Sequence, residues 1–433
     1  MFDILSFIDK KRIAENHNKG ELIAFVDAYN NHEIADCQVS SWLMATCING
    51  LCDDNLLEFT KALSESGKII SFPFEAVDKH STGGVGDKLT LLVVPIAASC
   101  GAKVAKLSGR GLGFTGGTAD KLEAIPGFNV SLSASCFVSQ VERIGCAISG
   151  HSPDLAPAEA KFYSLRDITS TLSSVPLIAS SIVSKKAAGG ARSIVYDVKC
   201  GDGAFMQTLD SARVLAEKLV SLSKAMGLKS IAIISDMGQP LGVNVGNSLE
   251  VIEAIETLNG RGPSDVYELA AYCAGAMIYL SGNANDLDEG ILAARESIDS
   301  GAAIRKFQEL VTEQGGVNDL CESPYKYLRV APLRHVVKSS EDGCIASINT
   351  RNIGECVKRL GGGRIQKSDP VDIEVGVKVL KKRGENVTKG EPLMEIYAND
   401  DIKIAEAEPY FNVFSIGKTN DNHRKNLIFE VIG

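Results

Sequence analysis

At 433 residues the chain is too long for one typical core, so we expect two or three domains. A hydrophobic content of 45% and a charged content of 23% are ordinary for a globular protein. The formal net charge of −9 argues against a nucleic-acid-binding protein, because phosphate backbones attract basic faces.

The cysteine pattern and the apolar runs predict a cytoplasmic protein. Eleven cysteines are scattered along the chain without a CxxC pair, which gives little support to a zinc site and fits reduced thiols. The first twenty residues lack a basic segment before an apolar stretch, so we do not expect a secretory signal. Since no apolar run reaches the roughly 18–20 residues that span a bilayer, we expect no membrane partner.

Residues 1–66 have the pattern of consecutive helices. In GELIAFVDAYNN (20–31), apolar residues recur at Leu22, Ile23, Val26 and Tyr29, which is a helical stripe. A later helix is expected from DDNLLEFTKALSESG, with Asp53 or Asp54 as its N-cap. Helices this apolar pack either on one another or on a second subunit.

From residue 69 the pattern changes to that of an α/β domain. KLTLLVVPIAASCG (88–101) and KVAKLSG (103–109) are apolar runs typical of buried parallel strands and the helices between them. SIVYDVKCGDG (193–203) and SIAIISDMGQPLG (230–242) are strand-then-glycine-loop units. In open α/β sheets, ligands bind at such loops, beyond the carboxyl ends of the strands.

Two further segments interrupt or follow this α/β pattern. Residues 157–190 are typical of two helices that are broken at Pro176. The tail, 336–433, contains VKVLKKRGENVTKGEPLMEIYAN (377–399), which alternates and turns like a small β domain. It resembles half of a lipoyl or biotinyl motif, but its lysines lie at strand ends, so a packing domain is favoured over a carrier domain.

Two glycine-rich segments indicate an anion-binding site. KHSTGGVGDK (79–88) and KLSGRGLGFTGGTADKLEAIPGF (106–128) lie within thirty residues of each other, and each follows a strand-like run. Glycine lets the backbone approach a ligand closely, and successive N–H groups then form an anion nest. Neither segment has the spacing of a dinucleotide-binding or P-loop fingerprint, so we do not expect a nucleotide cofactor.

The helical segment YSLRDITSTLSSVPLIASSIVSKK (163–186) carries a third group of polar residues. Ser181 and Lys185 are four positions apart and therefore share one face of a helix. Arg166 offers a planar fork that can pair with a carbonyl group or the edge of a ring. Taken alone, each of these residues could equally be a solvated surface residue.

Together, KHSTGGVGD, SGRGLGFTGGTADKLEAIPGF and YSLRDITSTLSSVPLIASSIVSKKAAGG resemble the signature segments of the thymidine and pyrimidine-nucleoside phosphorylase family. The resemblance covers essentially the whole chain and includes DVKCGDGAFMQTLDSAR and ISDMGQPLGVNVGNSLEVIEAIETL. It implies reversible phosphorolysis of pyrimidine nucleosides such as uridine, thymidine and deoxyuridine to free base and α-(deoxy)ribose-1-phosphate. Inorganic phosphate is then a co-substrate, and no organic cofactor is implied.

The resemblance also implies a fold and an assembly. The fold class is a helical domain plus a larger α/β domain with a mostly parallel sheet, and a C-terminal α+β subdomain. The implied boundaries are a pyrimidine-binding domain (1–68 with 157–190), a phosphate-binding domain (69–156 with 191–335) and the subdomain (336–433). The implied assembly is a homodimer through the helical domain.

The roles of site residues follow from the same resemblance. It implies Arg166, Ser181 and Lys185 as ligands of the pyrimidine edge, and His80 as either a general acid for the leaving base or only a helper in positioning phosphate. The implied phosphate ligands and their neighbours are Lys79, Ser81, Thr90, Lys106, Ser108 and Thr118. The segment around Lys106 also resembles the broad pyrimidine-nucleoside branch, which implies that Lys106 contacts a 2′-hydroxyl of the sugar.

The chain departs from the family pattern at three positions. Phe114 and His151 stand where the family commonly has His and Gln, so the contacts to the base are expected to differ. Lys88 replaces a small or hydroxyl residue in a region where some members bind potassium. The corresponding potassium ligands here are Gly86, Lys88, Leu241, Asn244 and Glu253, and we hypothesise that the Lys88 ammonium replaces the ion and pairs with Glu253.

Three other functions remain open from the sequence. The first is a strict thymidine phosphorylase, which tends to have an apolar residue at the position of Lys106. The second is a phosphoribosyltransferase of the same architecture, although Asp87 has no acidic neighbour between 79 and 118 that would complete a Mg²⁺ site. The third is a nucleoside-binding protein with a decayed site, which the intact cluster of basic and hydroxyl residues argues against.

Overall fold

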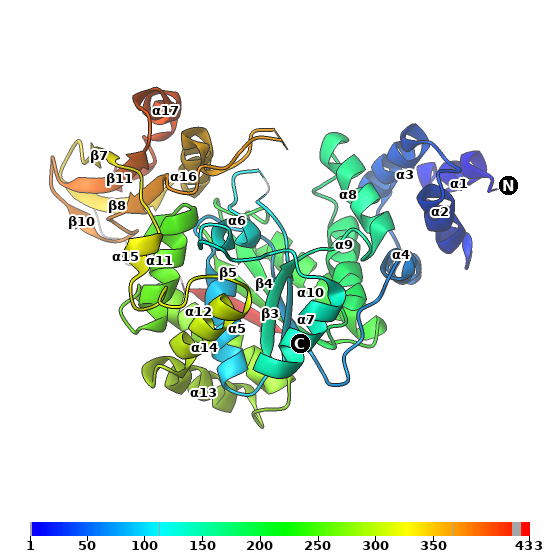
Figure 1. Ribbon diagram of the computed structural model, residues 1–433. Coiled ribbons are helices and arrows are strands. Elements are labelled where there is room, and N and C mark those ends of the chain that lie inside the picture. The colour runs from blue at the N-terminus through cyan, green and yellow to red at the C-terminus, as the bar shows by residue number, and fades with distance from the viewer. Residues whose placement is uncertain (1, 112, 367, 418–425) are drawn as a thin grey trace.

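The computed structural model describes residues 2–111, 113–366, 368–417 and 426–433. Three parts follow one another across Figure 1: a helical layer that includes the N-terminus, a central α/β part, and a β-rich part near the end of the chain. Within the described residues, no helix combines the length and the apolar character needed to cross a membrane. The predicted fold class is confirmed.

The central part is built on a mostly parallel sheet. Its described strands lie in the order β13-β5-β4-β1-β2-β3, and β13 alone among them runs antiparallel to its neighbour. The strands are β1 (Val77–Ser81), β2 (Val104–Ser108), β3 (Cys146–Gly150), β4 (Ser193–Cys200), β5 (Lys229–Asp236) and β13 (Ile428–Ile432). Every residue of β4 is buried, as expected for a parallel strand that helices cover on both faces.

Helices pack against this sheet and against one another, and they form most of the core. They are α5 (Leu89–Ser99), α6 (Thr118–Leu122), α7 (Ala134–Ile144), α10 (Leu209–Ala225), α11 (Asn247–Leu258), α12 (Ser264–Leu280), α13 (Leu287–Asp299), α14 (Ala302–Glu313) and α15 (Pro324–Tyr327). Of the two apolar runs, 88–101 forms α5 and 103–109 forms β2. The pattern alone could not separate them, because a fully buried helix is apolar all round.

The helical layer combines the first four helices with two from the middle of the chain. These are α1 (Ile4–Arg12), α2 (Glu21–Asn30), α3 (Asp36–Asn49), α4 (Asp53–Glu65), α8 (Pro157–Ile168) and α9 (Val175–Ala188). A cluster of aromatic rings that includes Phe25, Trp42, Phe59 and Phe162 holds them together. Helix α9 contacts both α4 and α10, so it joins the layer to the α/β part.

The last part of the chain is α+β. Two small sheets have the orders β6-β9-β11-β7 and β10-β8-β12. The strands are β6 (Asn244–Val245), β7 (Leu333–Lys338), β8 (Gly343–Ile348), β9 (Gly376–Val379), β10 (Asn386–Val387), β11 (Pro392–Ala398) and β12 (Phe414–Gly417). The helices are α16 (Thr350–Val357) and α17 (Asp401–Ala407), with single turns at Lys358–Gly362 and Glu408–Tyr410.

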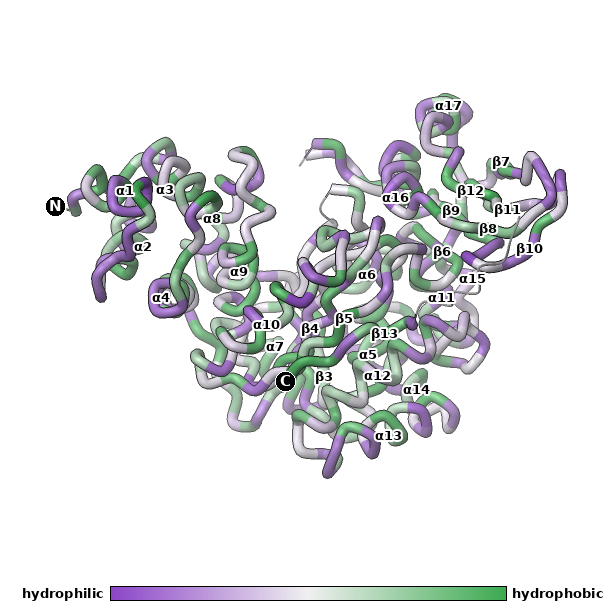
Figure 2. The backbone as a smooth tube through the Cα atoms, turned by 180° about the vertical axis from the view of Figure 1, so that it is seen from behind, coloured by the Kyte–Doolittle hydropathy of each residue, from purple (hydrophilic) through white to green (hydrophobic). Residues whose placement is uncertain are grey.

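Two strands tie this last part to the centre. Strand β6 belongs to the α/β segment but pairs with β9, and β13 returns from the end of the chain to pair with β5. Figure 2 shows the result from behind, with hydrophobic residues along the central strands and hydrophilic residues on the outer turns. The glycine-rich loops therefore stand on a buried and rigid base.

Candidate active site

The predicted phosphate ligands lie at the carboxyl ends of neighbouring parallel strands. Ser81 ends β1 and pairs in register with Asp197 of β4, while Ser108 ends β2 and pairs with Gly150 of β3. Thr118 is the first residue of α6, which follows the second glycine-rich loop. The sheet topology thus brings both loops to one edge, where open α/β sheets bind their ligands.

The first loop is shaped by backbone that glycine alone adopts easily. Gly83 and Gly86 have φ angles of +92° and +74°, in the region that L-residues rarely adopt. The Gly83 N–H donates to Ser81 Oγ at 3.1 Å, and the Ser81 hydroxyl in turn donates to the Asp87 carboxylate. Asp87 therefore fixes the direction of the Ser81 hydroxyl.

Lys79 is fully buried and held by carboxylates. Its Nζ lies 2.8 Å from Asp197 Oδ2 and 4.0 Å from Asp87 Oδ2, and Lys199 Nζ also lies 2.8 Å from Asp197 Oδ2. Burial alone would lower the pKa of Lys79, but the charges of Asp197 and Asp87 outweigh it and raise that pKa. Lys79 is therefore a permanent positive charge beneath the loop.

Asp87 is kept ionised by the same cluster. Burial would raise the pKa of its carboxyl group, but Lys79, Lys199 and Lys121 together lower that pKa. Lys121 of α6 also donates from Nζ to the backbone oxygen of Asp87 at 2.6 Å and pairs with Glu250 at 2.8 Å. These bonds link the first glycine-rich loop to the helix that begins after the second.

Two lysines share one carboxylate beneath β2. Lys186 of α9 pairs with Asp78 Oδ2 at 2.6 Å, and Lys106 Nζ lies 3.6 Å from Asp78 Oδ1. Both ammonium groups also donate to the backbone oxygen of Leu107, at 2.9 and 2.8 Å. Burial lowers the pKa of Lys106 to about 7, with the charge of Lys186 adding to the effect and Asp78 opposing it. Lys106 can therefore change its charge near neutral pH.

Thr90 is more buried than Thr118 among the predicted phosphate ligands. It is buried in the first turn of α5, directly after the first loop, whereas Thr118 is half-buried. The second loop is held closed by Gly117, where an added Cβ would lie 2.1 Å from the backbone nitrogen of Gly111. Leu112, between these glycines, lies outside the described residues.

Phe114 of the second loop faces the last part of the chain. Its ring centroid lies 5.7 Å from that of Phe205, and the guanidinium carbon of Arg351 lies 4.8 Å from the Phe114 ring centroid. The backbone of Gly354 approaches so closely that an added Cβ would lie 2.4 Å from the Phe114 oxygen. The aromatic side chain that replaces the usual His thus packs between the loop and α16.

His80 lies between the cations of two elements. Burial lowers its pKa well below the ordinary value, and the positive charges of Lys186, Lys106 and Lys185 add to the effect. The imidazole of His80 is therefore neutral near neutral pH. Because Lys106 belongs to β2 and Lys185 to α9, His80 lies where the strand ends face the helical layer.

His151 adds a second imidazole to this edge. It directly follows β3. Desolvation of its imidazole, together with the positive charges of Lys185, Lys186 and Lys106, lowers its pKa well below the ordinary value. The same three lysines act on His80. Both imidazoles are therefore neutral near neutral pH.

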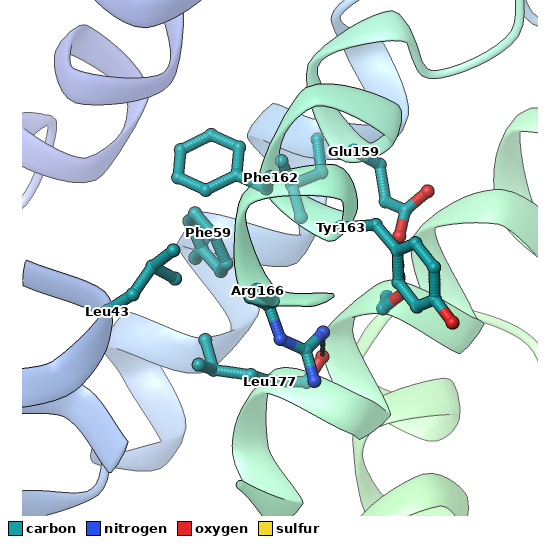
Figure 3. Close-up of a pocket in the computed structure, with 9 residues that line it drawn as sticks. Leu43, Phe59, Glu159, Phe162, Tyr163, Arg166 and Leu177 are labelled. Atoms are coloured by element: carbon teal, nitrogen blue, oxygen red, sulfur yellow. Dashed lines mark hydrogen bonds between the residues drawn. The ribbon is translucent and has the colours of Figure 1, made fainter. Parts of the chain in front are cut away.

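Two of the three predicted base ligands, Arg166 and Ser181, line a small pocket in the helical layer, and Lys185 is not part of its lining. Figure 3 shows Leu43, Phe59 and Phe162 on one side of this pocket and the polar groups of Glu159 and Tyr163 on the other. Arg166, Leu177 and Ser181 complete the lining, with Leu63. A pocket that has an apolar wall and a few directed polar groups is typical of a small-ligand site.

Arg166 is held in place by backbone oxygens. Its guanidinium donates to Leu177 at 2.9 Å, Leu172 at 3.1 Å and Thr171 at 3.4 Å, which uses three of its five N–H groups. The side chain is only 3% exposed, and burial lowers its pKa. The guanidinium is thus held in place. The contacts that the described residues make leave two of its N–H groups for a ligand.

Ser181 and Lys185 converge on Glu159, which the sequence analysis did not identify. The Ser181 hydroxyl donates to Glu159 Oε1, and Lys185 Nζ donates to the same oxygen at 3.0 Å and to Ser181 Oγ at 3.2 Å. Lys185 Nζ also lies 5.1 Å from the centroid of the Tyr163 ring. Glu159 is two residues into α8 and looked like an ordinary charge on a helix surface, so no signal in the sequence singled it out.

Lys88 fills the region in which the potassium ligands were expected. Its ammonium donates to the backbone oxygens of Leu241 at 2.8 Å and Asn244 at 2.9 Å, and to the Glu253 carboxylate. The Gly86 oxygen instead accepts the backbone N–H of Lys88 at 3.0 Å. Lys88 is 1% exposed, so this pair is buried. The ammonium has three N–H groups, and all three are used here.

Comparisons of the sequence with known families match three segments. Residues 74–304 match the a/b domain of a glycosyl transferase family, and residues 5–67 match the helical bundle domain of the same family. Residues 344–412 match a pyrimidine nucleoside phosphorylase C-terminal domain.

Curated relatives cover nearly the whole chain. The pyrimidine-nucleoside phosphorylase of Geobacillus stearothermophilus is 43% identical over 407 residues, which is 92% of this chain and 94% of that protein. Those of Staphylococcus haemolyticus and Staphylococcus epidermidis are 43% and 44% identical over 399 residues, or 92% of either chain.

A solved structure shares the fold. Anthranilate phosphoribosyltransferase from Thermus thermophilus superimposes with a TM-score of 0.58 at 19% identity, covering 71% of this chain and 98% of its own. At this identity the likeness concerns the fold alone.

Proposed function

Because this chain belongs to the pyrimidine-nucleoside phosphorylase family, it catalyses the phosphorolysis of pyrimidine nucleosides, and we propose that it accepts uridine, thymidine and deoxyuridine. A phosphate oxygen forms a bond to C1′ of the sugar while the bond from C1′ to N1 of the base breaks. The electron pair of that bond leaves with the base. The protein must hold phosphate on one face of the sugar and stabilise the departing base on the other.

The position of His80 carries this proposal. His80 precedes Ser81 at the carboxyl end of β1, and the charges of Lys106 of β2 and Lys185 of α9 act on its imidazole, so it would lie between the two reactants. Phosphate would bind to the hydroxyls of Ser81, Ser108 and Thr118, near the buried charge of Lys79. We include Thr90 and Lys106 as its neighbours. Fixed donors of this kind stabilise developing charge without reorganising during the reaction.

The base would bind between the helical layer and the central α/β part, against Arg166, Ser181 and Lys185. Cationic donors at its carbonyl oxygens lower the barrier because the base leaves with negative charge. His80 would act as the general acid toward the leaving base. Since unliganded His80 is neutral, we propose that the phosphate anion raises its pKa and so loads the proton that it delivers.

Lys88 takes the place of a potassium ion in this proposal. Its ammonium is bonded to the oxygens of Leu241, Asn244 and Glu253, which is the ligand set that the family resemblance implies for the ion. A charge tied to the first glycine-rich loop would hold that loop against the 241–244 turn. The enzyme would then need no added monovalent cation.

Lys106 supports use of ribonucleosides. It is the third residue of β2, and its side chain would lie next to the proposed sugar site, where an amino group can donate to a 2′-hydroxyl. A strict thymidine phosphorylase would gain nothing from this donor.

The division into domains that we propose is 1–68 with 157–190, 69–156 with 191–335, and 336–433. Cysteine usage supports a cytoplasmic location.

A homodimer would cover part of the helical layer. Leu5 of α1, Ile13 directly after it and Ile48 of α3 are 68%, 55% and 75% exposed. Exposed apolar side chains on two helices that contact each other favour an interface with a second copy. Light scattering of the wild type and of an Ile48→Glu variant tests this, since the variant should dissociate.

One substrate panel tests the function. Uridine, thymidine and deoxyuridine are each incubated with and without phosphate, and the absorbance change from nucleoside to free base is followed. We expect turnover of all three that requires phosphate. We expect no nucleotide to form from uracil, phosphoribosyl pyrophosphate and Mg²⁺, the reaction that a phosphoribosyltransferase would catalyse with release of pyrophosphate. Turnover of the two deoxynucleosides alone would contradict the proposed breadth of substrates. Ser108→Ala, which lacks one proposed phosphate ligand, should reduce the phosphate-dependent turnover.

A further inference from the structure

We propose that Glu159 selects for bases that carry a hydrogen on N3 by fixing the direction of the Ser181 hydroxyl. The proposal rests on the proposed function, in which Ser181 faces the pyrimidine edge. Glu159 does not contact the base in this account. It is a positioning residue that acts through Ser181.

The hydrogen bonds around Ser181 leave its oxygen with one role. A serine hydroxyl has one hydrogen to donate and two lone pairs that accept. Its hydrogen goes to Glu159 Oε1, and one lone pair accepts from Lys185 Nζ at 3.2 Å. Lys185 cannot take the hydrogen, because an ammonium group has no acceptor. A base that approaches Ser181 Oγ therefore meets one remaining lone pair.

Burial keeps the Ser181 hydroxyl in this orientation. Glu159 is 3% exposed and Ser181 is 6% exposed, so water offers the hydroxyl little alternative. The same Glu159 oxygen accepts from Lys185 at 3.0 Å, and this ion pair holds the carboxylate in place. Both partners of Glu159 lie on α9, one turn apart, while Glu159 itself lies on α8.

The direction of the hydroxyl then sorts pyrimidines by chemistry. Uracil and thymine carry an N–H at position 3, which can donate to the free lone pair. Cytosine carries a bare nitrogen there, so two lone pairs would face each other and a buried acceptor would stay unpaired. A site that is built to pair with an N–H rejects analogues that lack it far more strongly than an apolar pocket could.

The test compares binding of two free bases, uracil and cytosine, to the whole enzyme with phosphate present. Calorimetry measures both dissociation constants, and the ratio compared is the dissociation constant of cytosine divided by that of uracil. Glu159→Leu removes the acceptor, whereas Glu159→Gln keeps an oxygen at the same place. Ser181→Ala sets the ratio that remains from the exocyclic groups of the bases alone.

We expect Glu159→Leu to lower the ratio roughly tenfold or more, to within about threefold of Ser181→Ala. Glu159→Gln should stay within about threefold of the wild type, and Glu159→Leu combined with Ser181→Ala should match Ser181→Ala alone. A ratio that Glu159→Leu leaves unchanged, or that Glu159→Gln lowers as far as Glu159→Leu does, would overturn the proposal. Failure of the wild type to phosphorolyse any pyrimidine nucleoside would instead overturn the proposed function.

Folding does not confuse this result. A variant that unfolds would bind neither base, and circular dichroism identifies it. Glu159→Gln keeps the size and helical preference of the native residue, so it remains informative if Glu159→Leu is unstable. In that case the same binding measurements, alone and combined with Ser181→Ala, are made with Glu159→Met. Methionine is unbranched, and this variant should lower the ratio as Glu159→Leu would.

Discussion

The ammonium of Lys88 pairs with the carboxylate of Glu253, 165 positions further along the chain, inside the protein. Lys88 closes the first glycine-rich loop, and Glu253 lies in the middle of α11. The pair therefore connects the loop that would hold phosphate to a helix behind it.

Removing Lys88 should destabilise the protein and create a need for a cation. Lys88→Ala leaves the buried Glu253 carboxylate uncompensated, a loss of about 3–5 kcal/mol in the free energy of unfolding. Potassium should partly restore the melting temperature of the variant by binding in the vacated space, while the wild type should not respond. Tetramethylammonium chloride, which is too large for that space, controls for ionic strength.

A wild-type melting temperature that rises with potassium as steeply as that of Lys88→Ala would contradict the replacement of the ion by Lys88. Equal stability of the two proteins without potassium would do so as well. Lys403→Ala, on the exposed helix α17, serves as the matched loss of a lysine.

Replacing Lys106 should change the choice of sugar. Lys106→Met keeps the length of the side chain but removes its donors, so it should lower kcat/KM for uridine more than for deoxyuridine. These substrates differ only by the 2′-hydroxyl, and a lost hydrogen bond of this kind corresponds to roughly a fivefold to twentyfold change in their ratio. Steady-state kinetics measure it, and equal losses for both substrates would exclude contact of Lys106 with the 2′-hydroxyl.

The charge of Lys106 should also make stability depend on pH. Its pKa is about 7 in the folded protein and near 10.4 in the unfolded chain, so between these values the unfolded chain binds more protons. The free energy of unfolding should therefore rise with pH from about 7 to about 10, and Lys106→Met should flatten this rise. Urea titrations at several pH values test it; a rise of equal slope in the variant would contradict the lowered pKa.

Phosphate should raise the pKa of His80. In the unliganded protein, burial and the nearby lysines hold that pKa well below the ordinary value, and a bound anion partly cancels those positive charges. The chain has six histidines, so NMR spectra of the imidazoles of the wild type and of His80→Asn can assign the signal. A His80 pKa that phosphate leaves unchanged would exclude its loading as a general acid.

Acid should weaken the helical layer through His17. Its Nε2 accepts from Trp42 Nε1 at 2.9 Å, and its ring stacks on Phe7. Burial lowers its pKa to about 4, with Glu21 opposing and Lys10 and Lys11 adding to the effect. As pH falls from about 6.5 toward 4, the unfolded chain takes up a proton that folded His17 does not, so the melting temperature should drop.

Trp42 is the single tryptophan of the chain and reports directly on this contact. Its fluorescence should change in the same pH range, while His17→Gln, whose amide oxygen can still accept from Trp42, should flatten both responses. A wild type and His17→Gln with identical pH profiles would show that other groups cause the acid sensitivity.

The sequence predicted the parts of the fold whose local signals agree with their surroundings. The strand that ends at Ser108 and the helical pair around Pro176 have clear patterns, with Pro176 in the first turn of α9, where proline is tolerated. The cap of α4 was predicted wrongly. The helix begins one residue earlier than expected, with Cys52 as its N-cap and both aspartates in its first turn, where they favourably face the helix dipole.

The candidate site was predicted less completely, because its carboxylates act at a distance along the chain. Asp78 and Asp197 lie inside buried strands, and Glu159 lies on a helix, so nothing local marked them as partners of lysines. The pKa of Lys106 depends on burial and on Lys186, which is eighty positions away. The pattern of the basic and hydroxyl residues pointed to the chemistry, but only the folded chain shows which carboxylates set their charge and direction.

The contact between Lys88 and Glu253 determines how the positive charge at this position depends on the ions in the surrounding medium. A diffusible ion has a binding constant, so its site empties when the surrounding medium is poor in that ion. A side chain is covalently part of the protein, and its occupancy is complete in any medium at which the protein is folded and the amine is charged. The ionic composition of the medium is thereby removed as a variable at this position, and the amino-acid sequence alone decides whether the cation is present.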